Sequence, residues 1–234
     1  MSREPVTPFY DNYYGGEDLK RWRAAGAGDK ADHIVAMCRA LDPATILEVG
    51  CGDGAVLAEL AERGFGKELH GVEISSSGVA AGQARANPRL RSIARFDGYS
   101  LPFADKSIDL VFSTHVLEHV EHERPFLREL ARVGRTAFVE VPLEDTLRVA
   151  GAVVNDIGHI NFYNSVTFRA LLEEFFIVEQ LQLFDHSRDV LAHIHSRVPV
   201  AVRGALRSIA LSFIPSGAER IFVYHGAALC RPIG

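Results

Sequence analysis

Four side chains with acid–base or metal-binding chemistry stand close together in two short stretches of the sequence. His115, Glu118 and His119 lie three and four positions apart in STHVLEHV, and His159 stands farther along the chain in GHINFYN. Residues at that spacing share one face of a helix or turn. Imidazole and carboxylate groups together can hold a divalent cation, and one imidazole can instead take a proton near neutral pH. The two stretches therefore predict a site for metal binding or for proton transfer.

Three interpretations of these side chains stay open. In the first, Glu118, His119 and His159, with His115 as a further ligand, bind a divalent metal. So nitrogen-rich a set suits manganese, iron, nickel or zinc better than magnesium, which prefers oxygen ligands. In the second, the site is free of metal and the histidines orient or deprotonate a substrate. In the third, they are structural.

A glycine-rich turn follows a short apolar run in ILEVGCGDG. Gly50, Gly52 and Gly54 allow the backbone to approach a ligand closely, and the next helix can supply backbone amides to it. Gly50, Gly52 and Ala55 also satisfy the dinucleotide pattern G-x-G-x-x-A. Glu73 follows at the distance where an acid binds a ribose. The turn predicts a nucleoside-containing cofactor, and by itself it also fits a dehydrogenase.

The apolar periodicity around this turn predicts alternating strands and helices. Strands are predicted over 45–49, 68–74, 90–96, 108–113, 136–141, 177–184 and 220–229. Helices are predicted over 29–41, 55–63, 76–86, 124–133 and 165–175, the last capped by Asn164 or Ser165. Alternation of this kind predicts a parallel sheet with helices on both faces. Residues 188–215 are predicted to be less regular.

Three motifs occur in a fixed order: ILEVGCGDG, HGVEIS and FDGYSLPFADKSIDLVFSTHVLEHV. Together they resemble the class I S-adenosylmethionine-dependent methyltransferases, and the third is similar to the small-molecule branch that includes ubiquinone-biosynthesis O-methyltransferases. The resemblance runs from Ile46 to Phe176. It implies an α/β fold with a Rossmann-like, doubly wound, seven-stranded sheet, mostly parallel with an antiparallel last strand. It also implies an enzyme that uses S-adenosylmethionine as cofactor.

The resemblance also implies roles for acids near the strand ends. Glu73 would bind the ribose diol and Asp97 the adenine amino group. Glu48 would orient the glycine turn and help to receive the methionine ammonium. The remaining residues assigned to the cofactor are Gly50, Gly52, Gly54, Ile74, Gly98, Ser113 and Tyr14.

Methyl transfer to a hydroxyl of a small molecule, such as a sugar, phenol or natural product, is the predicted reaction. His115, His119 and His159 are the predicted catalytic residues, and magnesium, manganese or another divalent metal would assist by lowering the pKa of the hydroxyl. Similar E-x-x-E-H clusters of ubiquinone-type and small-RNA 3′-end methyltransferases resemble metal sites, and this chain has His115 at the place of the first acid. The alternatives are an N-methyltransferase with a histidine base, a non-catalytic cofactor-binding protein and an NAD-dependent dehydrogenase.

Composition limits the partners. The 234 residues are 47% hydrophobic and carry a net charge of −5, which predicts one sizeable domain with no overall attraction to nucleic acid. No apolar window long enough for a membrane span and no secretory signal pattern is present, so we expect a cytoplasmic protein, monomeric or homodimeric. Cys38, Cys51 and Cys230 lack paired spacing and are expected to be isolated buried thiols.

Domain organisation is predicted as an N-terminal lid over residues 1–28 and a methyltransferase domain over 29–234. Tyr10, Tyr13 and Tyr14 would close the lid. Residues 185–219 would form a substrate-side or interface insertion, whose arginines fit a solvated face, a clamp for an anionic substrate or a contact with anionic lipid. His186, His193 and His195 are expected in a strand face or turn. Glu140 and Glu144 are expected as an exposed loop pair, with a place in the lining of the acceptor pocket as the alternative.

Overall fold

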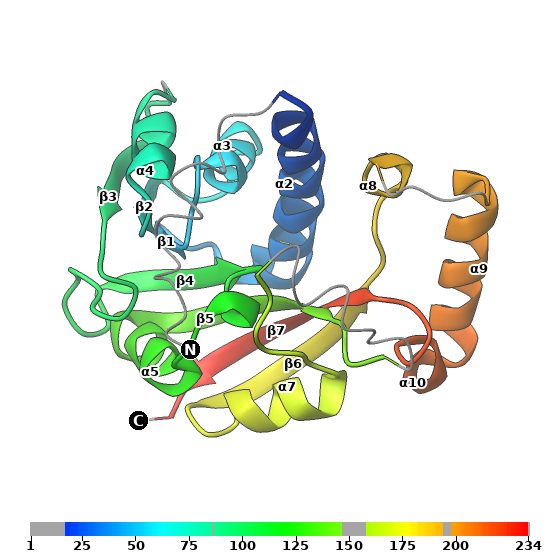
Figure 1. Ribbon diagram of the computed structural model, residues 1–234. Coiled ribbons are helices and arrows are strands. Elements are labelled where there is room, and N and C mark those ends of the chain that lie inside the picture. The colour runs from blue at the N-terminus through cyan, green and yellow to red at the C-terminus, as the bar shows by residue number, and fades with distance from the viewer. Residues whose placement is uncertain (1–16, 86, 147–157, 194–197, 234) are drawn as a thin grey trace, which may run out of the picture.

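A seven-stranded sheet forms the centre of the computed structural model, which describes residues 17–85, 87–146, 158–193 and 198–233 (Figure 1). The strand order is β3-β2-β1-β4-β5-β7-β6, and only β7 runs antiparallel to its neighbours. The strands are β1 (Thr45–Val49), β2 (Glu68–Glu73), β3 (Leu90–Arg95), β4 (Ile108–Thr114), β5 (Gly134–Leu143), β6 (Phe176–Phe184) and β7 (Tyr224–Pro232). The predicted fold class is confirmed. The order reverses between β1 and β4, where ligands bind in sheets of this kind.

Helices cover both faces of the sheet (Figure 1). The helices α2 (Glu17–Cys38), α3 (Ala55–Glu62) and α4 (Ser76–Gln83) lie on one side, and α5 (Glu123–Val133) and α7 (Ser165–Leu172) lie on the other. Two apolar cores result. Ile46 belongs to the core with α2 and α3, whereas the next residue, Leu47, belongs to the core with α5 and α7. Adjacent residues of a strand point to opposite faces, so β1 is apolar throughout because both of its faces are buried.

Helix α2 begins at Glu17, ahead of the predicted start at residue 29. Gly26 and Gly28 lie within the helix, and a Cβ at either position would meet nothing within 4 Å. The helix tolerates both glycines, because a glycine inside a helix costs only about 1 kcal/mol and the buried Ala27 and Ala31 anchor the helix. The proposed lid boundary at residue 28 therefore falls inside a continuous helix. Tyr10, Tyr13 and Tyr14 lie outside the described residues.

The segment predicted as irregular, 188–215, is mostly helical where it is described. It contains α8 (Arg188–His193) and α9 (Val200–Phe213), and α10 (Pro215–Ala218) begins at its end. Arg207 points inward: its Nε donates to Asp185 Oδ1 over 2.6 Å and its guanidinium lies 4.7 Å from the Tyr224 ring centroid. Arg203 donates to the Leu191 carbonyl. These two arginines therefore hold the helices together and do not form a cationic surface.

The remaining predictions on composition can be compared directly. All three cysteines are buried free thiols, as predicted. Burial raises the pKa of Cys38 and of Cys230 to about 12. In the part of the chain that the structure describes, no helix combines the length and the apolarity that a membrane crossing requires.

Candidate active site

The glycine turn closes tightly after β1. Gly50, Gly52 and Gly54 have φ angles of +79°, +52° and +70°, a left-handed conformation that favours glycine. The amides of Gly50 and Cys51 both donate to the Val72 carbonyl, at 2.8 and 3.0 Å. A Cβ added to Gly50 would lie 2.5 Å from Val116 Cγ2. The turn therefore packs directly against the segment that follows β4, where the HxxEH motif begins.

Glu73, at the end of β2, ties the glycine turn to the next loop. Its carboxylate is buried, and one oxygen accepts from Gly52 N at 3.0 Å while the other accepts from Ser75 N at 2.9 Å. The Ser75 hydroxyl in turn caps α4 by accepting from Gly78 N. Each carboxylate oxygen can accept more than one hydrogen bond, so Glu73 retains acceptor capacity for a diol.

Three other residues assigned to the cofactor lie at the adjoining strand ends. Asp97 Oδ1 accepts from Tyr99 N and Ser100 N at 2.8 and 2.6 Å, and these hydrogen bonds lower the pKa of the exposed carboxyl. A Cβ at Gly98, whose φ is +97°, would lie 3.8 Å from Ile74 Cγ2. The ends of β2 and β3 thus bring Glu73, Ile74, Asp97 and Gly98 to one edge of the sheet.

The last two residues assigned to the cofactor are Ser113 and Tyr14. Ser113 is buried, and its hydroxyl donates to the Val49 carbonyl at 3.1 Å. Tyr14 lies outside the described residues.

Glu48 is a buried acid beneath the glycine turn. Its side chain is 2% exposed, and its Oε2 has no hydrogen-bond partner within the described part of the chain. Burial raises the pKa of Glu48 well above its ordinary value, and Asp53 and Glu73 act in the same direction, while Lys30 opposes them. Acids gathered at one turn would repel a pyrophosphate and attract a cation. A cation placed at this turn would stabilise the ionised form of Glu48.

Glu118, His119 and His159 form a first cluster beyond β4. Glu118 and His119 lie on the short helix η2 (Leu117–His119), and one ligand atom from each of the three residues lies within 4.8 Å of the others. Glu118 is 1% exposed, and neither of its carboxylate oxygens has a hydrogen-bond partner among the described residues. The Nδ1 atoms of the imidazoles are engaged elsewhere, His119 with the Gly158 carbonyl at 3.1 Å and His159 with Glu144 Oε2 at 2.5 Å. Their Nε2 atoms are therefore the ones placed to bind a ligand.

The electrostatics of this first cluster suit a cation. Burial raises the pKa of Glu118 to about 7 and lowers that of His119 to about 4. Burial also works to lower the pKa of His159, but the hydrogen bond with Glu144 and the charge of Glu118 raise it overall. A buried carboxylate without hydrogen bonds, beside imidazoles oriented through their other nitrogen, is the arrangement that divalent metals use. The three residues therefore fit a divalent metal.

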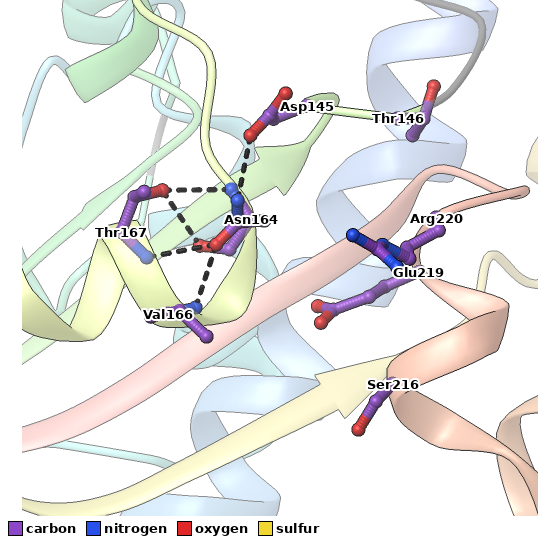
Figure 2. A pocket seen from close by; sticks show the side chains of 8 residues that line it. All are labelled: Asp145, Thr146, Asn164, Val166, Thr167, Ser216, Glu219 and Arg220. Carbon is purple, nitrogen blue, oxygen red and sulfur yellow. Dashed lines mark hydrogen bonds between the residues drawn. The ribbon is translucent and has the colours of Figure 1, made fainter.

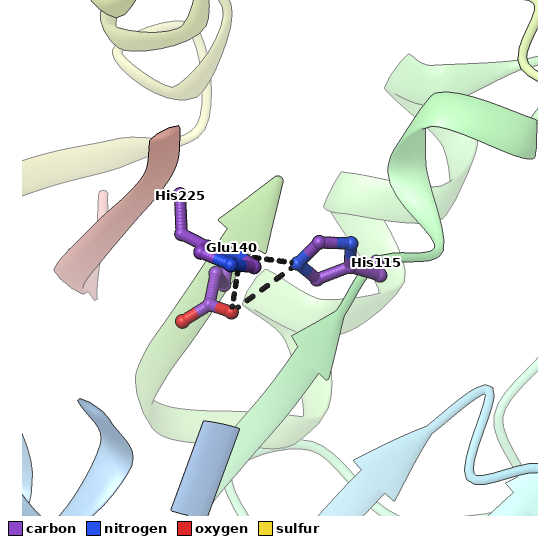
Figure 3. Close-up of side chains that lie close together, drawn as sticks. All are labelled: His115, Glu140 and His225. Atoms are coloured by element: carbon purple, nitrogen blue, oxygen red, sulfur yellow. Dashed lines mark hydrogen bonds and ion pairs between the residues drawn. The ribbon is translucent and has the colours of Figure 1, made fainter. Parts of the chain in front are cut away.

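A second cluster lies beside the first and contains His115, Glu140 and His225 (Figure 3). His115 Nε2 is 2.7 Å from His225 Nδ1, and both nitrogens are 3.4 Å from Glu140 Oε1. His115 has φ +56°, an uncommon conformation for a residue with a side chain. The prediction that Glu140 belongs to an exposed loop pair is wrong, because this residue lies within β5 and is fully buried.

Two further histidines extend the second cluster. His33 Nδ1 lies 2.8 Å from Glu140 Oε2, and the His33 ring stacks on Phe184 at 4.0 Å between centroids. His186 Nδ1 lies 2.6 Å from His225 Nε2. The sequence interpretation missed His33 and His225 and placed His186 in a strand face or turn.

The two clusters differ in charge. Burial lowers the pKa of His186 to about 2, and burial and Lys30 hold that of His115 well below its usual range. Burial alone would raise the pKa of Glu140, but the surrounding imidazoles of His115, His225 and His33 keep it well below its usual range. The second cluster thus joins an ionised carboxylate to the neutral imidazoles of His115 and His186.

A separate hollow of about 430 Å³ opens between the loop after β5, α7 and α10 (Figure 2). Its lining residues are Asp145, Thr146, Asn164, Val166, Thr167, Ser216, Glu219 and Arg220. None of them belongs to the glycine turn or to either histidine cluster. The Asn164 carboxamide caps α7, and Glu219 accepts from Ser165. The chemistry assembled at the strand ends is therefore not in this hollow.

These features define a class of protein, a doubly wound α/β domain whose glycine turn and strand-end acids lie where the strand order reverses. Residues 47–137 match the family described as "Methyltransferase domain". This segment of the chain is therefore similar to methyltransferase domains, and the matched residues include the glycine turn and the HxxEH motif.

Similar proteins include both N- and O-methyltransferases. The chain is 34% identical over 96 residues to ajmaline N-methyltransferase from Rauvolfia serpentina, covering 39% of this chain and 33% of that protein. It is 28% identical over 159 residues to the protein named as a probable tocopherol O-methyltransferase of Oryza sativa subsp. japonica. That match covers 56% of this chain and 44% of the rice protein. The matches thus span about a third to a half of these relatives' length. In fold, the chain is similar to a chain in the solved complex of a Haloferax volcanii methyltransferase with its activator. That similarity has a TM-score of 0.65 at 15% identity and covers 99% of this chain and 100% of the other.

Proposed function

We propose that this protein transfers a methyl group from S-adenosylmethionine to a small-molecule acceptor, at a hydroxyl oxygen. The packing of Val116 against Gly50 is the observation that carries this proposal. It joins the glycine turn to the segment that carries His115, Glu118 and His119, so a cofactor at the turn and an acceptor at these side chains would lie next to each other. In-line methyl transfer requires that proximity.

The cofactor supplies an electrophilic methyl group on a positively charged sulfur. Glu48 and the glycine turn would receive the amino acid part, Glu73 would accept from the ribose hydroxyls, and Asp97 would accept from the adenine amino group. The buried oxygen of Glu48 that lacks a hydrogen-bond partner supports the first role, because an ammonium group would satisfy it. The acids around the turn would also favour the positive charge of the sulfonium.

The first cluster would act on the acceptor hydroxyl. Glu118, His119 and His159 would hold a divalent metal, whose contribution is to lower the pKa of a hydroxyl that it binds. Glu144 and the Gly158 carbonyl would keep the two imidazoles in the required orientation. His115 would lie at the edge of this cluster, 3.5 Å from Glu118. The orphaned Glu118 carboxylate supports the metal-assisted version.

An amine acceptor is the second candidate. The similarity to an N-methyltransferase favours it. The histidines would then act without metal, with one of them removing the proton of the ammonium product.

Calorimetric titration tests the proposal. Metal-stripped protein is titrated with S-adenosylhomocysteine, then with Mn²⁺ and Mg²⁺, and the series is repeated with His119→Ala. His122→Ala is the control, since His122 is a neighbouring exposed histidine outside both clusters. We expect the cofactor product to bind in every variant and Mn²⁺ binding to weaken only in His119→Ala.

Acceptor panels separate the two candidates. O-methylation is supported if S-adenosylhomocysteine forms in the presence of hydroxyl acceptors and forms faster when Mn²⁺ is added. Turnover of amines alone, indifferent to chelator, supports N-methylation. Failure of S-adenosylhomocysteine to bind at all would refute both.

A further inference from the structure

The second cluster combines two imidazoles and one carboxylate from three strands of the sheet. His115 follows β4, Glu140 lies on β5 and His225 lies on β7. We propose that these three residues bind a divalent transition-metal ion of the zinc or iron(II) type, at a site distinct from Glu118, His119 and His159. The inference needs no assumption about methyl transfer.

The distances suit an ion. His115 Nε2, His225 Nδ1 and Glu140 Oε1 form a triangle with sides of 2.7, 3.4 and 3.4 Å. The point equidistant from its corners lies about 1.9 Å from each, so a small displacement from the plane places an ion at the usual metal–ligand distance of about 2.0–2.2 Å. Two imidazoles and a carboxylate are also a ligand set that zinc and iron(II) use.

Hydrogen bonding alone leaves this cluster unsatisfied. Glu140 is fully buried, and its Oε1 has no hydrogen-bond partner among the described residues although two imidazole nitrogens face it. A neutral imidazole carries a single N–H. If the proton of His115 lies between His115 and His225, neither nitrogen can donate to Glu140. A cation bound by all three atoms would satisfy the carboxylate and both nitrogens together.

Each of the three proposed ligands also contacts a neighbouring side chain through its second polar atom. His33 Nδ1 contacts Glu140 Oε2, His186 Nδ1 contacts His225 Nε2, and His115 Nδ1 lies 3.5 Å from Glu118 Oε1. Outer contacts of this kind orient the ligands of protein metal sites. They also place His115 between the two clusters, so its two nitrogens face two different sites.

Three protein ligands leave a coordination position for another group. Catalytic zinc sites typically have three protein ligands and fill the fourth position with water or a substrate oxygen. His115 is partly exposed, with 22% of its side chain accessible, whereas Glu140 is fully buried. The second ion would therefore take water or an oxygen of a small molecule from the side of His115.

Metal stoichiometry tests the inference. The full chain is stripped with a chelator, incubated with Co²⁺ or Zn²⁺ and dialysed, and the bound metal is determined by elemental analysis. We expect two ions per chain in the wild type and one in His225→Gln and in Glu140→Gln, with loss of the visible absorption of one Co²⁺ centre. His159→Gln should also retain one ion, and its visible absorption should be that of the Co²⁺ centre that is lost in His225→Gln and Glu140→Gln. His33→Phe should weaken the second site by about 10- to 100-fold, as loss of an outer partner does.

Controls make each outcome decisive. His193→Gln changes an exposed histidine outside both clusters and should retain two ions. Binding of S-adenosylhomocysteine and circular dichroism verify that each variant is folded, and Glu140→Gln preserves side-chain shape in case His225→Gln does not fold. The wild type could instead bind a single ion that is lost in His225→Gln and kept in His159→Gln. That result would support the second site, and the proposed function would then proceed without a metal at the first cluster. If folded Glu140→Gln and His225→Gln bind as much metal as the wild type, or the wild type binds none, the inference is overturned.

Discussion

Replacing Glu73 by glutamine should separate its two roles, because one carboxylate serves both the glycine turn and the proposed ribose contact. The wild-type carboxylate accepts from Gly52 N and Ser75 N. A glutamine has one acceptor oxygen, so its NH₂ group would face one of these two amides. Leaving a buried donor unsatisfied costs about 1–3 kcal/mol. We expect the free energy of unfolding to fall by about that amount.

Cofactor affinity should fall as well. In Glu73→Gln the turn would be displaced, and the hydrogen bonds between a charged carboxylate and the diol would be lost. Loss of a hydrogen bond to a charged group costs roughly 1.5–3 kcal/mol of binding free energy. At 1.4 kcal/mol per tenfold change, S-adenosylhomocysteine should bind about 10- to 100-fold more weakly. Calorimetry gives the affinity and urea unfolding the stability. Glu68→Gln is the matched control, since Glu68 begins the same strand but pairs with Arg91 at an exposed position.

A double-mutant cycle identifies the ribose contact. Wild type and Glu73→Gln are each titrated with S-adenosylhomocysteine and with analogues that lack the 2′- or 3′-hydroxyl. If Glu73 accepts from the diol, the two losses should be non-additive by about 0.5–3 kcal/mol. Strict additivity would mean that Glu73 acts only by supporting the turn. Wild-type affinity in Glu73→Gln would refute the reasoning for both roles.

Three further predictions concern other parts of the site and the core. Gly50→Ala places a Cβ 2.5 Å from Val116 Cγ2 at φ +79°, so S-adenosylhomocysteine should bind at least about tenfold more weakly by calorimetry, with partial recovery in the double variant with Val116→Ala. Asp97→Asn should lower the urea midpoint near neutral pH; the difference should shrink as the pH falls below the ordinary pKa of 3.8 and vanish once the pH has fallen through the lower pKa of the folded state. The three cysteines should resist a thiol reagent in the folded protein at about pH 8, because the raised pKa values leave almost no thiolate, and all three should react in urea.

Local patterns predicted the sheet well, because the buried strands are short apolar runs, and β1, β2 and β7 end at or next to a glycine, an acid or a proline. The predicted first strand has the observed limits, Thr45–Val49. The cap of α7 is equally local, and Asn164 accepts from the amides of Val166 and Thr167. Such features depend on neighbours in the chain and can be predicted from the sequence.

The errors fall where tertiary contacts decide. The glycines of α2 lie in a helix whose burial outweighs their low helix propensity. The arginines of the 188–215 segment were expected to face solvent, an anionic substrate or anionic lipid, yet Arg207 lies between Asp185 and the ring of Tyr224. Neither the depth of an arginine nor the extent of a glycine-containing helix follows from periodicity, because both depend on what packs against them.

The histidine clusters show which groupings of side chains can be predicted from spacing in the sequence and which cannot. His115, Glu118 and His119 are close in the chain, and their grouping was predictable. His115 and His225 are separated by 110 residues and meet only because β7 enters the sheet beside β5. A signal was nevertheless present. Glu140 interrupts the apolar run AFVEVPL of a central strand, and a buried carboxylate needs compensation by a donor or a cation. Given the strand order, the register pairs Glu140 with Thr114 on β4 and with Ala227 on β7, and His225 lies two residues from Ala227 on the same face of β7. An acid inside a central strand therefore predicts compensating groups on the adjacent strands, and here those groups are imidazoles.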